Sequence, residues 1–293
     1  MDRILFGDNQ FFGVNHMSEE KARQQLMRFK DNAAIIEVLD IAYDAGVKTF
    51  MCTTHDRMAG VCEHMRKDPT RYKDFVFYPC MPYAHKYANS VTEVGPLETI
   101  KRFSAGSVVG TLLRGAMGAI TKDIYDLMKL LVDGEMKAFK GLSTPVIFVQ
   151  NVVTDLLLGM GLHGVFPEFH KYVRERYGAE AGFITMNMPA LLDVLEKQGI
   201  ENPIVCSNIN KIDFRMCGGL ELYEKTIRER RFRPVAMSVF ASGAIPPEEA
   251  LEYVCGQRRI ESIVFGASSK RNIEQTRDLI RKIDARHAGA ATR

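Results

Sequence analysis

The sequence of 293 residues lacks the features that mark several common classes of protein. None of its six cysteines forms a Cys-x-x-Cys pair, which argues against a zinc ribbon or a thioredoxin-like redox site. Neither sign of charge dominates, because 39 Lys and Arg residues oppose 36 Asp and Glu residues and leave a net charge of +3. A nucleic-acid-binding protein would instead carry a concentrated basic face. We therefore expect a globular protein with reduced cysteines and no nucleic-acid partner.

Long apolar stretches are missing as well. No run approaches the roughly 20 apolar residues that a transmembrane helix needs. The most apolar region, residues 106–120, contains Arg114 and four glycines. The first seven residues do not have the apolar segment of a signal peptide. The sequence therefore predicts a cytoplasmic protein with no membrane partner.

The sequence does contain a regular alternation of short apolar runs with longer helical patterns. Eight runs are unbroken and rich in Val, Ile and Phe, which is typical of parallel strands buried on both faces. These runs cover residues 4–6, 48–52, 75–78, 146–149, 182–186, 203–206, 235–238 and 262–265. Helical patterns between them cover residues 33–45, 190–198, 248–255 and about 270–285.

Strand, helix and strand in repetition predict an α/β fold with a parallel sheet. Eight units favour a closed (βα)8 barrel, the TIM barrel, over an open sheet, and residues 7–13 do not supply the Gly-x-Gly-x-x-Gly turn of a dinucleotide-binding open sheet. We expect residues 1–293 to form one barrel domain. Residues 96–140 form a predicted helical insertion after the third strand, with one helix over 122–131, and this insertion offers a surface for a homodimer. Residues 151–166 are predicted to be a long, glycine-rich loop.

Polar side chains follow most of the predicted strands, where barrels carry their functional groups. Loop polarity alone accounts for part of this pattern. It accounts poorly for Gln150 and Asn151, which stand inside an apolar sequence, because buried amides need partners and a ligand can be one. The polar positions after the first three strands include Asp8, His16, Thr53, Thr54, His55, Asp56, Tyr83, His85 and Lys86.

Three of these residues are histidines, namely His16, His55 and His85, and each follows a different strand. Together with Asp8 or Asp56 they could bind zinc or iron(II). Their spacing matches no known metal motif, and loop histidines more often act as general acids, hydrogen-bond donors or surface residues. We therefore predict no bound metal.

The eighth predicted strand is followed by a glycine turn, two hydroxyl groups and a lysine. Gly266, Ser268, Ser269 and Lys270 stand where the last helix begins. The free backbone N–H groups and the dipole of a helix N-terminus favour a phosphate there, and many barrels hold a phosphate at this end of strands seven and eight. A plain serine N-cap is the alternative. The location and the adjoining Arg271 favour the phosphate.

Four segments carry a family resemblance. Residues 182–210 contain a strand, a helix and a strand with Ser-Asn, residues 233–243 end in Ser-Gly, residues 263–275 contain Gly-Ala-Ser-Ser, and residues 5–13 end in an aromatic-glycine turn. On these segments the chain resembles the aldo/keto reductase superfamily over nearly its whole length, as a divergent member. In that family the Gly-Ala-Ser-Ser segment holds the adenosine phosphate of NADP. The resemblance thus implies NADP binding by Asn187, Ser238, Gly266, Ser268, Ser269 and Lys270.

The family's catalytic Asp, Tyr, Lys and His are not retained. The Asp position holds Met51, and the Tyr position falls near His55 or Asp56. The Lys position falls near Cys80 or Met81, with Lys86 as the nearest lysine, and the His position falls on Gln150 or Asn151. Hydride transfer without the tyrosine and its lysine partner has lost its usual proton donor.

The leading hypothesis is an NADP-dependent oxidoreductase that acts on a small polar carbonyl or sugar-like substrate. His55 would donate the proton, Asp56 would keep it protonated, and Lys86 would be its partner. Asn151 would orient the carbonyl, and His16 and Asp8 complete the predicted catalytic set.

Two other classes stay open. One is a cofactor-free or metal-assisted lyase, isomerase or hydrolase with a substrate phosphate at residues 266–270. The other is a binding or scaffold protein that has lost its chemistry, against which the many amides and histidines argue.

Overall fold

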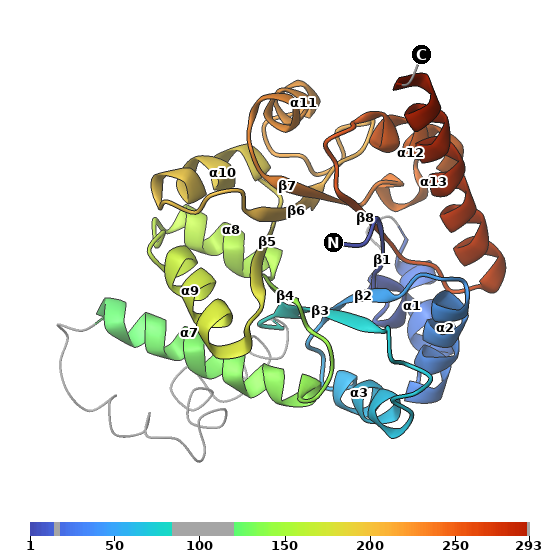
Figure 1. Ribbon diagram of the computed structural model, residues 1–293, viewed down its shortest axis with the longest axis horizontal. Helices are drawn as coiled ribbons and strands as arrows, with labels where there is room; N and C mark the ends of the chain where they lie inside the picture. The colour runs from blue at the N-terminus through green and yellow to red at the C-terminus, as the bar shows by residue number, and fades with distance from the viewer. Residues whose placement is uncertain (15–17, 84–119, 292–293) are drawn as a thin grey trace.

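The structure is a computed structural model that describes residues 1–14, 18–83 and 120–291 (Figure 1). Eight parallel strands pair in sequence order and close into one barrel, with β1 hydrogen-bonded to β8. The predicted (βα)8 barrel is confirmed. The strands are β1 (Ile4–Phe6), β2 (Thr49–Thr53), β3 (Val76–Met81), β4 (Val146–Val149), β5 (Glu180–Thr185), β6 (Ile204–Asn208), β7 (Arg233–Met237) and β8 (Ser262–Phe265).

Helices surround the barrel in the order that the alternating pattern predicts (Figure 1). After the first two strands come η1 (Asn9–Phe11), α1 (Glu19–Arg28), α2 (Asn32–Asp44) and α3 (Met58–Lys67). Between β3 and β6 lie α7 (Ile120–Met136), η2 (Lys137–Phe139), α8 (Asn151–Gly159), α9 (Val165–Tyr177) and α10 (Met188–Lys197). The last are α11 (Leu220–Glu229), η3 (Ala241–Gly243), α12 (Pro247–Gly256) and α13 (Lys270–Ala291). None of the helices in these described ranges is long and apolar enough to cross a bilayer.

Two segments differ from the sequence prediction. The predicted loop over residues 151–166 is wrong, because α8 occupies most of it and α9 begins at its end. The glycines that suggested a loop stand at the junction, where Gly161 has a positive φ of 71°, rather than throughout the segment. Helix α7 runs longer than the predicted helix at 122–131, and residues 96–119 of the predicted insertion lie outside the described residues.

Side chains along each strand alternate between the helix layer and the barrel interior. On β2, Phe50 and Cys52 pack with the helices, whereas Met51 joins the interior cluster with Tyr78 and Phe148. The ring of Phe148 fills the space beside Gly182, where a Cβ would lie 2.3 Å from Cε1 of the ring. The interior is therefore filled by side chains, and a ligand can bind only at an end of the barrel.

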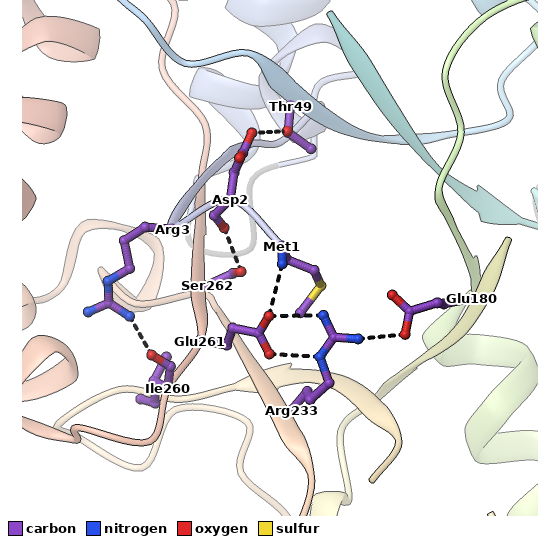
Figure 2. A network of polar contacts seen from close by, with 9 residues as sticks. All are labelled: Met1, Asp2, Arg3, Thr49, Glu180, Arg233, Ile260, Glu261 and Ser262. Atoms are coloured by element: carbon purple, nitrogen blue, oxygen red, sulfur yellow. Dashed lines mark hydrogen bonds and ion pairs between the residues drawn. The ribbon is translucent and has the colours of Figure 1, made fainter. Parts of the chain in front are cut away.

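The end at which the strands begin carries a network of ion pairs (Figure 2). Glu261 accepts hydrogen bonds from the amino group of Met1 at 2.9 Å and from Nε and Nη2 of Arg233 at 2.8 and 2.9 Å. Arg233 also donates to Glu180 from Nη1 at 2.6 Å. The Arg233 guanidinium lowers the pKa of Glu261 to about 2. These charges pair with one another and leave the opposite end of the barrel for chemistry.

Candidate active site

Asp8 and Thr53 meet where β1 and β2 end. Oδ2 of Asp8 accepts a hydrogen bond from the backbone N–H of Thr53 at 2.7 Å and another from its hydroxyl at 2.6 Å. Only 6% of Asp8 is exposed, and burial raises the pKa of its carboxyl although the Thr53 bonds oppose the shift. No cation within the described ranges pairs with it, and its own backbone N–H is the only further hydrogen-bond donor to the carboxyl found there. An uncompensated carboxyl with a raised pKa is suited to give or take a proton.

His55 follows β2 and is held between two aromatic rings. Its ring stacks on Phe12, with centroids 4.2 Å apart and planes at 10°, and lies 5.1 Å from the ring of Tyr83. Nδ1 of His55 accepts a hydrogen bond from the backbone N–H of Arg57 at 3.1 Å. In this arrangement Nδ1 is the acceptor, which leaves Nε2 as the ring nitrogen that can donate. Asp56 itself is exposed.

Tyr83 and Glu135 belong to the same cluster. Glu135, on α7, is 7% exposed and accepts hydrogen bonds from the backbone N–H of Tyr83 at 3.3 Å and from the hydroxyl of Thr54. Burial raises the pKa of Tyr83, and the negative charges of Asp8 and Asp56 raise it further. Helix α7 thus ties the ends of β2 and β3 together around the site.

Sequence reasoning placed Tyr83 in the polar ring but not in the catalytic set, and it missed Glu135 entirely. A glutamate on an amphipathic helix carries no local signal that it is buried. Only its partners, Thr54 and Tyr83, far away in the sequence, reveal it.

Asn151 and Gln150 lie where β4 ends, as expected from the sequence. The backbone N–H of Gln150 donates to the carbonyl of Met81 at 2.8 Å, and half-buried Asn151 is the first residue of α8. One turn later, Asp155 fixes the end of β5, because its two oxygens accept from the hydroxyl of Thr185 at 2.5 Å and from the N–H of Met186 at 3.0 Å. Burial raises the pKa of Asp155.

Several amides of the polar ring serve the backbone. Nδ2 of Asn208 donates to the carbonyl of Arg215 at 2.7 Å, and Asn210 exchanges two hydrogen bonds with the backbone of Phe214. Oδ1 of Asn187 accepts from the N–H of Ala190 at 3.4 Å and caps α10. Part of the ring is therefore structural, and the cap leaves Asn187 only its amide N–H groups for a cofactor.

The loop after β7 holds unusual backbone conformations. Ser238, Ala241 and Ser242 have φ values of 54°, 45° and 58°, in the left-handed region that side chains other than glycine rarely adopt. Such strain persists where the surrounding structure imposes it, often at ligand sites. Ser238, predicted to contact a cofactor, is the first of the three.

The two serines in the turn from β8 into α13 have different roles. Ser269 caps α13, because its hydroxyl accepts from the N–H of Asn272 at 3.3 Å. The hydroxyl of Ser268 has no partner within the described ranges, and its carbonyl accepts from Nη2 of Arg28 at 2.5 Å. The backbone N–H groups of residues 267–269 likewise make no backbone hydrogen bond to a described residue. These donors suit a phosphate.

A buried acceptor lies against the same turn. Gln10 is 5% exposed and donates from Nε2 to the carbonyl of Gly7 at 2.8 Å, but its Oε1 has no hydrogen-bond partner in the described part of the chain. A Cβ at Gly266 would lie 2.1 Å from that oxygen, so only glycine fits here. A buried carbonyl oxygen without a donor fits a hydroxyl or amide N–H of a bound molecule.

Three predicted residues, His16, His85 and Lys86, lie outside the described residues. The structure therefore brings together Asp8, His55 and Asp56 around Tyr83, and places Lys270, exposed, at the β8 turn. Within the described ranges, no three His, Cys, Asp or Glu side chains are grouped so that they could hold a metal ion.

Two surface depressions of about 340 and 420 Å³ lie at the other end of the barrel, beside Arg3. Arg3 is already occupied, because it donates from Nε and Nη2 to Asp284 at 2.9 Å each and from Nη1 to the carbonyl of Ile260 at 2.5 Å. We therefore place the functional site at the carboxyl ends of the strands, where groups without partners are found.

No family model matches the sequence, and no curated protein matches it. Solved structures do match. A Pseudomonas aeruginosa protein described as an aldo-keto reductase superimposes with a TM-score of 0.61 at 13% identity, over 96% of this chain and 90% of its own. The holo form of an aldo-keto reductase from Bacillus halodurans gives 0.56 at 10% identity, over 97% and 90%. One from Brucella melitensis gives 0.53 at 10% identity, over 94% and 88%.

The chain has the aldo-keto reductase fold. The resemblance seen in the sequence is thus confirmed at the level of the fold. Met51, where the sequence resemblance puts the family's aspartate, packs inside the apolar interior of the barrel. Asp8, on the neighbouring strand, is the buried carboxyl at this end of β1 and β2.

Proposed function

We propose that this protein is an NADP-dependent oxidoreductase that reduces a small polar, sugar-like carbonyl compound. The observation that carries the proposal is the β8–α13 turn on an aldo-keto reductase fold. There, the Ser268 hydroxyl, the neighbouring backbone N–H groups and the buried Oε1 of Gln10 have no hydrogen-bond partner among the described residues. The residues present therefore fit a phosphorylated nucleotide.

Gly266, Ser268 and Lys270 would hold the adenosine phosphate, and Ser238 and Asn187 would contact the rest of the cofactor. NADPH, when bound, supplies a hydride to the carbonyl carbon. Every other task falls to the residues of the chain, which must orient the carbonyl, stabilise the negative charge on its oxygen and deliver a proton to it.

His55 is placed to polarise the carbonyl. Its Nδ1 accepts from Arg57, so its Nε2–H is the donor, and a neutral imidazole that donates in this way stabilises a developing oxyanion. The Phe12 and Tyr83 rings fix its orientation. The half-buried amide of Asn151 is a second donor at the same end of the barrel.

Asp8 is placed to supply the proton. Burial raises the pKa of its carboxyl, which increases the protonated fraction near neutral pH. The sequence predicted His55 for this role, and we propose Asp8 instead because Nδ1 of His55 accepts from Arg57 while the buried Asp8 carboxyl has a raised pKa. The partnership of Lys86 with His55 stays a prediction.

The polar character of the site indicates the substrate class. Asp8, His55, Asp56 and Asn151 all follow strands at the same end of the barrel and would offer hydrogen-bonding groups that suit a substrate with several hydroxyl groups.

The test is NADPH consumption against a panel of aldoses, ketoses and simple polar aldehydes, together with the melting temperature in NADPH. We expect a melting shift with NADPH and turnover with at least one hydroxylated carbonyl. The Asp8→Asn variant should keep the melting shift and lose turnover. No melting shift and no turnover over the whole panel would refute the proposal.

One observation favours a second candidate, an isomerase or lyase that acts on a sugar phosphate without a nicotinamide cofactor. Asp8 has no counter-ion within the described ranges and could serve as a base as well as an acid. The β8–α13 turn would then hold the phosphate of the substrate. This candidate requires a melting shift with sugar phosphates and none with NADPH.

A further inference from the structure

Helix α1, near the beginning of the sequence, brings a charged residue to the β8–α13 turn, which lies near the end of the sequence. The sequence pattern did not predict this helix, because none of its residues is buried. Its last residue, Arg28, donates from Nη2 to the carbonyl of Ser268 at 2.5 Å. The two residues are 240 positions apart, so the contact arises only in the fold.

The position of Arg28 is fixed by the core. The next residue, Phe29, is 1% exposed and packs edge-on against Phe11, with centroids 5.0 Å apart. Gly13 seats the helix from the other side, because a Cβ there would lie 2.5 Å from Cγ of Leu26, and its φ of 64° also requires glycine. The guanidinium carbon of Arg28 lies 5.3 Å from the centroid of the Phe29 ring.

The charge of Arg28 is not neutralised by the described part of the chain. No carboxylate there pairs with it, and its Nε and Nη1 have no acceptor there. Arg271 makes no ion pair with a described residue either, and Lys270 has only Glu274 at 4.0 Å. A guanidinium anchored by one N–H, with further N–H groups available, is suited to grip a phosphate oxygen.

Gln10 adds an independent observation that points to a ligand. Its Oε1 is buried, has no donor and lies against Gly266, in the same turn as Ser268. The turn therefore offers cations and N–H donors for a phosphate and lies beside a buried side-chain oxygen that has no donor in the described structure.

We propose that Arg28 is a specificity residue that binds the phosphomonoester on the adenosine ribose of NADP and so makes the site select NADP over NAD. NAD carries a hydroxyl at that place, which offers no charge to a guanidinium. The inference rests on the proposed function, because it concerns the same cofactor site. It adds that the selecting cation comes from α1 and not only from the helix that begins at the turn.

The experiment is equilibrium binding of two pairs of ligands, NADPH against NADH and adenosine 2′,5′-diphosphate against adenosine 5′-monophosphate. The variants are Arg28→Gln, Arg28→Lys and the control Arg23→Gln, which changes an exposed arginine of α1 that makes no hydrogen bond or ion pair with a described residue. We expect Arg28→Gln to weaken NADPH and the diphosphate by roughly 10–100-fold and to leave NADH and the monophosphate unchanged. Arg28→Lys should be intermediate, since it keeps the charge and loses the fork.

A second measurement is the dependence of binding on salt concentration. The contact is exposed, so the preference for NADPH over NADH should shrink as ionic strength rises, and this dependence should be weaker in Arg28→Gln. Equal losses for both nucleotides in Arg28→Gln, or no loss for either, would overturn the inference while the proposed function stands. Failure of the unaltered protein to bind either nucleotide or the diphosphate would overturn the proposed function and the inference with it.

Discussion

Asp8→Asn should separate stability from activity. Asp8 is buried, no cation of the described residues pairs with it, and the pKa of its carboxyl is raised, mainly by burial. A raised pKa means that the folded state favours the neutral acid, so ionisation at neutral pH destabilises the fold. Both of its hydrogen bonds from Thr53 fall on Oδ2. Asn can therefore keep both bonds on its oxygen and place its NH₂ where Oδ1 stood.

The expected gain in the free energy of unfolding is about 0.5–2 kcal/mol at pH 7 to 8. This is the range for a single stabilising substitution, here one that removes a functional residue which destabilises the fold. The pH dependence gives the sign. A carboxyl whose pKa is raised in the folded state contributes fully to the free energy of unfolding at pH values below its ordinary pKa, which is near 4. That contribution is lost as the pH rises through the pKa that the carboxyl has in the folded protein. The advantage of Asp8→Asn should thus be small at pH 4, grow with pH and then level off.

Denaturant unfolding from pH 4 to pH 8 measures this difference, and turnover measured alongside should fall by roughly 10²–10⁴. Asp155→Asn is the matched control. Asp155 is a half-buried carboxyl whose pKa is also raised by burial, but it accepts with both oxygens, so an NH₂ group there would give up one of the two accepted hydrogen bonds, from the Thr185 hydroxyl or from the N–H of Met186. That variant should lose stability. If Asp8→Asn is as destabilising as Asp155→Asn at neutral pH, or retains full turnover, the reasoning about Asp8 is wrong.

Three further variants test the site and the scaffold. His55→Gln should lower turnover by roughly 10²–10⁴ with little change in the melting temperature, and full turnover would remove His55 from the mechanism. Gly182→Ala should cost roughly 1–3 kcal/mol of unfolding free energy, because its Cβ would meet the Phe148 ring inside the barrel; an unchanged denaturation midpoint would show that the ring moves aside freely. Glu261→Gln should cost about 1–2 kcal/mol at neutral pH, because the Arg233 guanidinium lowers the pKa of Glu261 to about 2. That stabilisation is present above the usual carboxyl range and is lost as the pH falls toward 2, so a penalty that is equal at pH 7 and pH 2 would contradict it.

The strands could be predicted because each is buried on both faces and therefore leaves an unbroken apolar run in the sequence. The bounds of β1, β4 and β8 agree with the runs to the residue. Helix α1 could not be predicted in the same way, since it buries none of its residues and has no apolar stripe facing the core. Helix α8 was mistaken for a loop because glycines at its end and beyond it outweighed the Val and Leu residues between them.

The site was predictable in place but only partly in detail. Residues that follow strands were correctly located at one end of the barrel, as the turn at Gly266 shows. The sequence could not tell whether Ser268 or Ser269 caps α13, because the two are adjacent and the answer depends on the exact residue at which the helix begins. The contacts of Glu135 with Thr54 and of Arg28 with Ser268 join distant parts of the chain, so no local pattern could indicate them.

The central claim, that the β8–α13 turn binds the phosphate of NADP, is tested most directly by titrating the protein with NADPH. The chain contains no tryptophan, so the emission of NADPH itself is the signal. The account predicts saturable binding that the double variant Ser268→Ala, Lys270→Glu weakens by roughly 2–4 kcal/mol, through the loss of two charge-assisted contacts. Binding of equal strength in the double variant, or no saturable binding by the unaltered protein, would contradict it.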